Sequence, residues 1–204
     1  MQGKFITLEG IEGSGKSTNL KVVKAILDQY KIDYIFTREP GGGPLGPHLR
    51  KLLLDKDQSI SPSVEMLLMM ADRKDHVDNL INPNLKKGIW IISDRYLDST
   101  IAYQGGGREL DISLINSLSI ALKLPTPDLT LLFDLPVDVS LQRAEERSEL
   151  DRFEREPKDF HSRIRDSYLE LALSNHRIKT VDSSKDFEFV SMQVEKYLID
   201  FLNE

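Results

Sequence analysis

The chain has 204 residues, of which 40% are apolar and 29% charged, and its formal net charge is −6. This length suits one α/β domain with a sizeable core, so we expect a single domain over residues 1–204. The negative charge argues against a nucleic-acid-binding protein, because such proteins concentrate basic residues. The lack of cysteine excludes disulfides and thiolate metal sites.

The first residues, MQGKFITLEG, enter a strand-like pattern directly, without a leader-type segment. No apolar run in the sequence approaches the roughly 18 residues of a membrane span. We therefore expect no membrane partner and a cytoplasmic location.

Strand-like and helix-like segments alternate along the chain. Short apolar runs predict strands at residues 4–9, 34–37, 88–93, 129–135 and 178–181. Helical periodicity predicts helices at residues 16–30, 45–54, 61–80, 111–122, 137–147, 157–175 and 187–202. This alternation predicts an α/β fold of three layers, α/β/α, in which helices flank a five-stranded parallel sheet.

The helix at residues 61–80 has a clear start. Ser61 can cap it with its side chain, and Pro62 suits the first helical position. The segment MLLMMA within it is apolar on nearly every side, so we expect it to be buried. The residues that we assign to its apolar face are Val64, Leu67, Leu68 and Ala71.

Residues 10–18 carry a phosphate-binding pattern. GIEGSGKS matches GxxxxGK[ST], follows a predicted strand and opens a predicted helix, which is typical of the P-loop NTPase fold. Lys16 would neutralise the β- and γ-phosphates of ATP, and the Ser17 hydroxyl would bind Mg²⁺. The alternative is a glycine-rich turn with a chance lysine. The predicted ATP-binding residues are Gly10, Ile11, Glu12, Gly13, Ser14, Gly15, Lys16, Ser17 and Thr18.

Charged residues follow the predicted strands at the edge where parallel sheets bind ligands. Asp94 ends the strand 88–93, where it would hold Mg²⁺ through water, although a turn or capping aspartate is the alternative. Arg38 and Arg95 each follow a strand as well. A phosphate acceptor needs positive charge and in-line alignment rather than a base, whereas a hydroxyl acceptor needs a carboxylate. The four histidines show no pairing pattern, and we interpret them as structural or surface residues.

Five segments together resemble the bacterial thymidylate kinase family. They are GIEGSGKS at residues 10–17, TREPGG at 37–42, DRY at 94–96, AYQG at 102–105 and LDRFE at 150–154. The resemblance implies transfer of the γ-phosphoryl group of ATP to thymidylate with Mg²⁺, in a homodimer whose short mobile lid covers residues 143–156. Lys16, Arg95 and Arg147 would be its catalytic residues.

The resemblance also implies roles for residues that bind the acceptor. Glu12 would accept a hydrogen bond from the 3′-hydroxyl of the deoxyribose, and Arg73 would meet the thymine carbonyl edge. Glu39 would lie near the metal and phosphates. The acceptor phosphate would be held by Arg38, Arg50 and Arg95, the loop shaped by Glu39 and Pro40, and the base and sugar pocket lined by Thr100, Tyr103 and Gln104.

Two positions depart from the family pattern. Met69 stands where the family has a phenylalanine that stacks on thymine, and a thioether can still pack against a ring. The lid is the second departure, because some lids of the family carry several basic residues, whereas here Glu145 and Glu146 precede Arg147. The family has its catalytic arginine either in the P-loop or on the lid. Since the P-loop has Gly13 and no arginine, the resemblance implies that the lid supplies it as Arg147. Arg143 and Arg152 are its neighbouring cations, and we expect Asp151 to pair with one of these arginines.

The charged segment that contains Arg147, residues 145–157, is almost without apolar side chains. Taken alone, its composition is also typical of a solvated helix face.

Three alternative functions remain open. A deoxynucleoside kinase would use Glu39 as a general base, and another pyrimidine monophosphate kinase would be compatible with Met69. An ATP-dependent switch or scaffold would bind ATP without turnover of a monophosphate.

Overall fold

The computed structural model describes residues 3–147 and 150–203, except for the side chain of Arg147. The strands are β1 (Phe5–Glu9), β2 (Tyr34–Arg38), β3 (Trp90–Asp94), β4 (Leu129–Asp134) and β5 (Ile178–Asp182). They pair in parallel in the order β2-β3-β1-β4-β5, which confirms the five-stranded parallel sheet predicted from the sequence.

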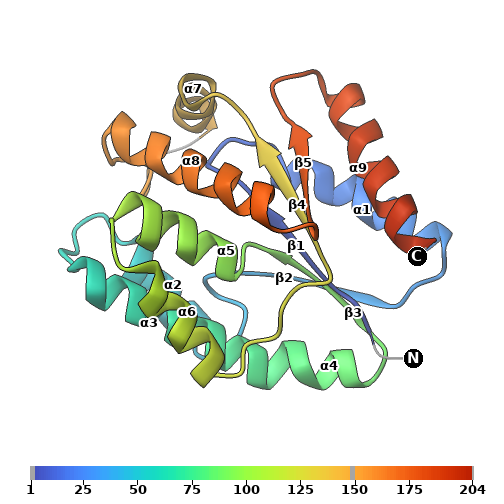
Figure 1. Ribbon diagram of the computed structural model, residues 1–204, viewed down its shortest axis with the longest axis horizontal. Coiled ribbons are helices and arrows are strands. Elements are labelled where there is room, and N and C mark those ends of the chain that lie inside the picture. The colour runs from blue at the N-terminus through green and yellow to red at the C-terminus, as the bar shows by residue number, and fades with distance from the viewer. Residues whose placement is uncertain (1–2, 148–149, 204) are drawn as a thin grey trace.

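Helices flank both faces of this sheet, in the three predicted layers (Figure 1). The helices are α1 (Lys16–Gln29), α2 (Gly46–Leu54), α3 (Pro62–His76), α4 (Asn82–Lys86), α5 (Leu97–Thr100), α6 (Ile112–Ala121), α7 (Val137–Arg147), α8 (Lys158–Ser174) and α9 (Phe187–Leu202), with π-helical segments η1 (Val77–Ile81) and η2 (Ile101–Gly107). None of the described helices is both long and apolar enough to cross a membrane.

The hydrophobic core lies on both faces of the sheet. On one face, α1 and α9 pack on the strands through Val23, Leu27 and Val194, among other side chains. On the other face, α8 and η2 cover β4, and Phe160 and Ile164 are buried there. Because β1 lies in the centre with both faces covered, its carboxyl end has a fixed position, and the P-loop follows it directly.

The sequence did not predict the helical stretch from α5 through η2, which contains three consecutive glycines. These glycines allow η2 to pack closely on α8. A Cβ atom on Gly106 would come 2.7 Å from Ser167 Cβ, and one on Gly107 would come 2.6 Å from Phe160 Cε2. Tertiary packing therefore outweighs the low helix propensity of glycine at this place.

The face of α3 that we predicted to be buried points outward. Val64 and Leu67 are 47% and 53% exposed, whereas Glu65 and Arg73 on the opposite face are buried. The inner face is mixed, because Met69 and Arg73 line a cavity whereas Met66 and Met70 are buried in an apolar cluster. Burial of the MLLMMA segment is therefore confirmed for these two methionines, but apolar periodicity assigned Val64 and Leu67 to the wrong side. Ser61 precedes the helix with Pro62 in its first turn, but its side chain makes no capping hydrogen bond.

The charged segment at residues 145–157 is not a solvated helix face over its described second half. Phe153 and Glu154 are 4% and 5% exposed, and Phe153 packs in the same cluster as Tyr103 and Phe160. Residues 148–149, in the middle of the predicted lid, lie outside the described part of the chain. The mobility of the lid stays a prediction.

Candidate active site

A cavity of about 570 Å³ lies at the carboxyl edge of β1, β2 and β3. The topology explains its position, since the P-loop follows β1 and the segments after β2 and β3 reach the same edge. The predicted residues that line it are Glu12, Gly13, Ser14, Gly15, Lys16, Ser17, Thr18, Arg38, Glu39, Pro40, Arg50, Met69, Arg73, Asp94, Arg95, Thr100, Tyr103 and Gln104. Gly10 and Ile11 belong to the same loop but do not line the cavity.

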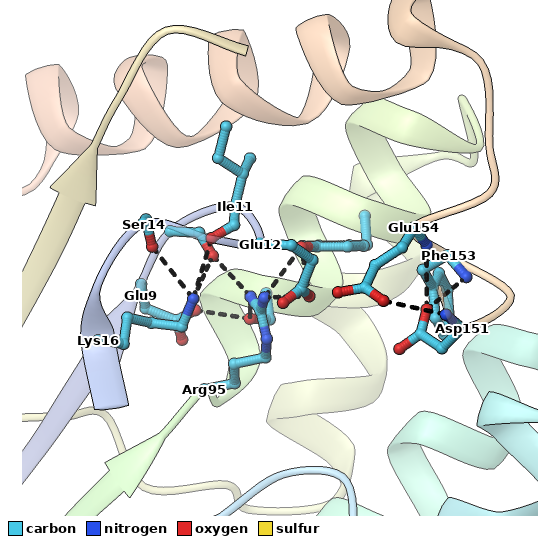
Figure 2. Close-up of polar contacts among 12 residues, drawn as sticks. Glu9, Ile11, Glu12, Ser14, Lys16, Arg95, Asp151, Phe153 and Glu154 are labelled. Carbon is cyan, nitrogen blue, oxygen red and sulfur yellow. Dashed lines mark hydrogen bonds and ion pairs between the residues drawn. The ribbon is translucent and has the colours of Figure 1, made fainter. Parts of the chain in front are cut away.

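The P-loop wraps around the Lys16 ammonium group. Lys16 Nζ donates to the carbonyl oxygens of Gly10 (2.9 Å) and Ile11 (3.1 Å) and to Ser14 Oγ (3.2 Å), as Figure 2 shows. Gly15 has φ 88°, a conformation that suits glycine and turns the chain into α1. Burial, together with the charge of Arg95, lowers the pKa of Lys16 to about 8. A bound polyphosphate would supply the negative charge that this buried ammonium group lacks.

Arg95 lies between the P-loop and the wall of the cavity (Figure 2). Its Nη2 donates to Glu12 Oε1 at 2.5 Å and to the Tyr103 hydroxyl at 3.0 Å, and its Nη1 donates to the carbonyl oxygen of Gly10. The backbone of Arg95 has φ 72°, a left-handed conformation that is uncommon for residues other than glycine and costs roughly 1–3 kcal/mol. The strained backbone turns the chain at the end of β3, where this guanidinium group is held against the P-loop.

Arg73 and Glu39 form a buried ion pair beneath the cavity. Arg73 Nε donates to Glu39 Oε2 at 2.8 Å, and His76 Nδ1 lies 2.8 Å from Glu39 Oε1. Arg73 also donates to the Thr100 hydroxyl and to the Tyr96 carbonyl oxygen, both at 2.8 Å. Both Glu39 oxygens are therefore engaged, and Glu39 shapes the loop after β2 rather than standing as an unoccupied carboxylate.

Two further arginines add positive charge near the end of β2. Arg38 is exposed, whereas Arg50 is half-buried and donates to the Pro40 carbonyl oxygen at 2.7 Å. Burial and the neighbouring charge of Arg38 lower the pKa of Arg50. Two cations near each other in a partly buried cavity disfavour one another, so this part of the site favours an anionic ligand.

Asp94 and Ser17 fit a hydrated magnesium ion. Asp94 Oδ1 is buried and has no hydrogen-bond partner within the described residues, and the Ser17 side chain is exposed to the cavity. A buried oxygen of this kind needs a donor such as a metal-bound water. Among the described residues, no three His, Cys, Asp or Glu side chains form a metal-binding group. Such an ion would therefore depend mainly on phosphate and water oxygens, as Mg²⁺ commonly does.

Comparison with known proteins places this geometry in a family. The family model described as thymidylate kinase matches residues 8–194. The chain is 47% identical to the thymidylate kinase of Carboxydothermus hydrogenoformans over 97% of this chain and 98% of that protein. It is 43% identical to that of Neisseria meningitidis over 97% of each chain. The chain belongs to the thymidylate kinase family.

Another part of the cavity wall comes from α3, α5 and η2. Thr100, Tyr103 and Gln104 line it there together with the half-buried Met69, at the position where the family resemblance leads us to expect phenylalanine. Thr100 and Gln104 are each 1% exposed, and Tyr103 is 6% exposed. This part of the cavity therefore combines a flexible apolar side chain with buried polar groups, a lining typical of small-molecule sites.

The arginines of the predicted lid have separate positions. Arg152 does not line the cavity but donates to Glu65 Oε2 (2.6 Å) and to the Leu53 carbonyl oxygen (3.0 Å). Arg143 lines the cavity, and Arg147 ends α7 with a side chain outside the described atoms. The expected pairing of Asp151 with an arginine is absent from the contacts of the described residues.

Asp151 instead organises the backbone of the lid segment. Its Oδ1 accepts from the amides of Phe153 (2.8 Å) and Glu154 (3.0 Å), as Figure 2 shows. A short aspartate side chain commonly closes such a turn. The carboxylate therefore shapes the turn that carries Phe153 into the core.

Sequence reasoning missed a buried carboxylate behind Arg95. Glu9, the last residue of β1, accepts from the Ser99 hydroxyl (2.6 Å), the Tyr168 hydroxyl (2.9 Å) and the Tyr96 amide (2.8 Å). Ser99 and Tyr168 in turn contact Arg95 Nη1. The sequence offered only one signal, a glutamate at the end of an apolar strand, and its partners come from distant segments.

The ionisation of Glu9 should affect stability. Burial and the nearby Asp98 carboxylate raise the pKa of Glu9 to about 7 from 4.5. The folded protein thus holds this proton more tightly, so the stabilising contribution is complete below pH 4.5 and is lost as the pH rises through about 7. We expect the difference in unfolding free energy, wild type minus Glu9→Gln, to fall across this range and then stay level.

Urea denaturation of both proteins from pH 4.5 to 8 measures this difference. Tyr168→Phe is the matched control, because it removes one donor but keeps the carboxylate, and it should retain a pH-dependent difference from Glu9→Gln. A constant difference between wild type and Glu9→Gln would contradict the prediction.

Proposed function

We propose that the protein transfers the γ-phosphoryl group of ATP to thymidylate, giving ADP and thymidine diphosphate. The observation that carries this proposal is the pairing, in one cavity, of a P-loop with a separate arginine cluster. The P-loop suits a nucleoside triphosphate, and Arg38, Arg50 and Arg95 suit a second phosphate. Membership of the thymidylate kinase family supports the same reaction.

The proposed chemistry needs no general base. An oxygen of the acceptor phosphate, already anionic at neutral pH, attacks the γ-phosphorus of ATP. The new P–O bond forms as the bond from the γ-phosphorus to the β,γ-bridging oxygen breaks, and ADP leaves. The protein contributes alignment and positive charge. Lys16 would hold the β- and γ-phosphates, and Arg95 the acceptor.

Mg²⁺ is the proposed cofactor, and it would neutralise negative charge on the phosphates of ATP. Ser17 would bind it through its hydroxyl, and Asp94 through water. The unpartnered buried oxygen of Asp94 supports this assignment.

A hydroxyl acceptor fits the cavity less well. A deoxynucleoside kinase would need Glu39 as its base, but Arg73 and His76 occupy both Glu39 oxygens. Removing a proton from a hydroxyl would require this ion pair to break within the protein interior, where leaving a charge unpaired costs several kcal/mol.

For the acceptor nucleoside, we propose that Arg73 meets the carbonyl edge of thymine and that Thr100, Tyr103 and Gln104 surround the base and sugar. Met69 would pack against the ring. Glu12 would accept the 3′-hydroxyl of the deoxyribose, and its present contact with Arg95 keeps its carboxylate beside the arginine that would hold the acceptor phosphate.

Arg147 is the proposed lid arginine. Two neighbouring cations already have protein partners, since Arg152 contacts Glu65 and Arg143 Nη1 donates to the Ser183 carbonyl oxygen at 3.3 Å. The lid would bring Arg147 to the transferring phosphoryl group and exclude water.

We further propose a homodimer in the cytoplasm. Exposed apolar side chains of α3 and α6 would form the dimer surface, among them Val64, Leu67 and Ile120. The two helices share one core cluster through Met66, Met70 and Ile115 on their inner sides. Burying this surface against a second copy would remove it from water.

A substrate panel tests the proposed function. ADP formation with ATP and Mg²⁺ should be fastest with thymidylate, compared with deoxyuridylate, deoxycytidylate, adenylate, guanylate and thymidine. Lys16→Ala should abolish turnover without unfolding the protein. Turnover of thymidine alone would contradict the proposal, as would ATP binding with no monophosphate turned over.

Substitution of Arg147 tests the lid. Arg147→Ala should lower kcat by ~10³-fold, the lower range for arginine fingers, because its contact would form in the transition state. The KM for thymidylate should change little. A change in KM alone would contradict this role, and so would a larger loss of kcat in the matched variant Arg143→Ala.

Sedimentation tests the dimer. The wild type should have twice the 23.3 kDa mass of one chain, and Leu67→Glu should shift it to the monomer by placing a charge in the apolar surface. Met192→Glu, a change at an equally exposed apolar residue of α9 on the opposite face of the sheet, should remain dimeric. A monomeric wild type would exclude the proposed assembly.

A further inference from the structure

Glu65, on the inner face of α3, is completely buried and collects donors from two other segments. Its Oε1 accepts from Gln104 Nε2 at 2.8 Å and from Arg108 Nε at 3.2 Å. Its Oε2 accepts from Arg108 Nη2 at 3.1 Å and from Arg152 Nη1 at 2.6 Å. One carboxylate thus joins α3 to the end of η2 and to the lid segment.

These contacts determine which end of the Gln104 amide faces Glu65. A guanidinium group has donors only, so the two arginines require both Glu65 oxygens to act as acceptors. An amide oxygen turned toward this carboxylate would meet another acceptor in the protein interior, which is strongly unfavourable. The Gln104 amide must therefore direct its NH₂ group to Glu65, because the hydrogen-bonding chemistry of the neighbouring groups allows only this orientation.

The Gln104 amide oxygen is then the atom left for the cavity that this residue lines. None of the hydrogen bonds in the described residues uses it. Arg73 also lines the cavity. It donates from Nε to Glu39, from Nη1 to the Thr100 hydroxyl and from Nη2 to the Tyr96 carbonyl oxygen. The other Nη1 hydrogen faces Met70 Sδ at 3.8 Å, so among the described residues the second Nη2 hydrogen has no hydrogen-bond partner. The wall thus offers one fixed donor and one fixed acceptor.

We infer that Glu65 is a positioning residue that sets base specificity by fixing the orientation of the Gln104 amide. This inference rests on the proposed function of the cavity. Thymine and uracil have an accepting O4 beside a donating N3–H, which match the Arg73 donor and the Gln104 oxygen. Cytosine has a donating N4 amino group beside an accepting N3, so it mismatches both.

This donor and acceptor would distinguish cytosine from thymine and uracil by hydrogen bonding, but they would not distinguish thymine from uracil. Buried polar groups that are left unpaired can reject a wrong substrate by about 10⁴-fold or more. If the amide could rotate, Gln104 would donate to cytosine N3 and one of the two mismatches would disappear. Loss of Glu65 should therefore weaken selection against cytosine without changing the chemistry of phosphoryl transfer.

Glu65→Gln is the sharpest test, because the new amide has nearly the same shape and can accept or donate. We expect the ratio of kcat/KM for thymidylate to that for deoxycytidylate to fall by ~10-fold or more, the scale of one hydrogen-bond mismatch. Arg108→Gln is the matched control. It breaks an ion pair on the same carboxylate but leaves the Glu65–Gln104 contact, so its ratio should stay close to that of the wild type.

A double-substitution cycle separates positioning from general structural damage. Gln104→Ala should lower the same ratio by itself, and adding Glu65→Gln to it should cause no further fall, because the two residues act through one amide. An additive effect would overturn the inference, as would an unchanged ratio in Glu65→Gln. Turnover of thymidylate by the wild type is measured first. If the wild type does not turn over thymidylate, the proposed function fails and the inference fails with it. If it does, the outcomes above test the inference alone.

A measurement on the unmodified protein covers the case in which Glu65→Gln does not fold. In ¹⁵N-labelled wild type, the side-chain NH₂ of Gln104 should exchange slowly with solvent even without a nucleotide, since it is bound to a buried carboxylate. Exchange as fast as that of an exposed glutamine would overturn the inference.

Discussion

The site depends on one electrostatic constraint, which is that several cations must stay buried in the cavity before any anionic ligand arrives. An unpaired buried charge costs several kcal/mol, so each such group needs a partner in the protein itself. Arg73 has Glu39, and Arg95 has Glu12. Among the described residues, Lys16 donates to neutral oxygens of its own loop, and burial, together with the charge of Arg95, lowers its pKa to about 8.

The same partners hold the cations in place. The Arg95 guanidinium group donates hydrogen bonds to acceptors from the P-loop, α5, η2 and α8, so little reorganisation would be needed to bind a phosphate there. Arg38 and Arg50 lie elsewhere along the cavity, and burial together with the neighbouring charge of Arg38 lowers the pKa of Arg50. Positive charge is thus concentrated in the cavity, and an anion bound there would relieve its repulsion.

Helix α3 carries buried charged residues on its inner face and exposed apolar residues on its outer face. Its inner face carries Glu65, Asp72, Arg73 and His76, which are all buried and which hold the loop after β2 and the wall of the cavity. Burial and the nearby Glu39 raise the pKa of Asp72 to about 6, a measure of how closely acidic groups are packed there. Its outer face carries Val64 and Leu67, exposed and apolar. The helix therefore joins the candidate active site to the surface proposed for a second copy.

Local sequence signals determined the strands, most of the helices and the phosphate-binding loop. The P-loop is readable because glycine, lysine and serine act within a few residues of one another, and the alternation of strands and helices allows few topologies. The chain itself thus identified the edge of the sheet where Lys16, Asp94 and Arg95 meet. Only the tertiary structure decided which side of α3 is buried. Periodicity assumes that the interior is apolar, whereas α3 packs partly on an apolar cluster and partly against a cavity with polar walls. The roles of Glu9 and Glu65 were likewise recognised only from the tertiary structure, because the donors to a buried carboxylate can be distant in the sequence. For Glu65 they lie 39 residues away in Gln104 and 87 residues away in Arg152.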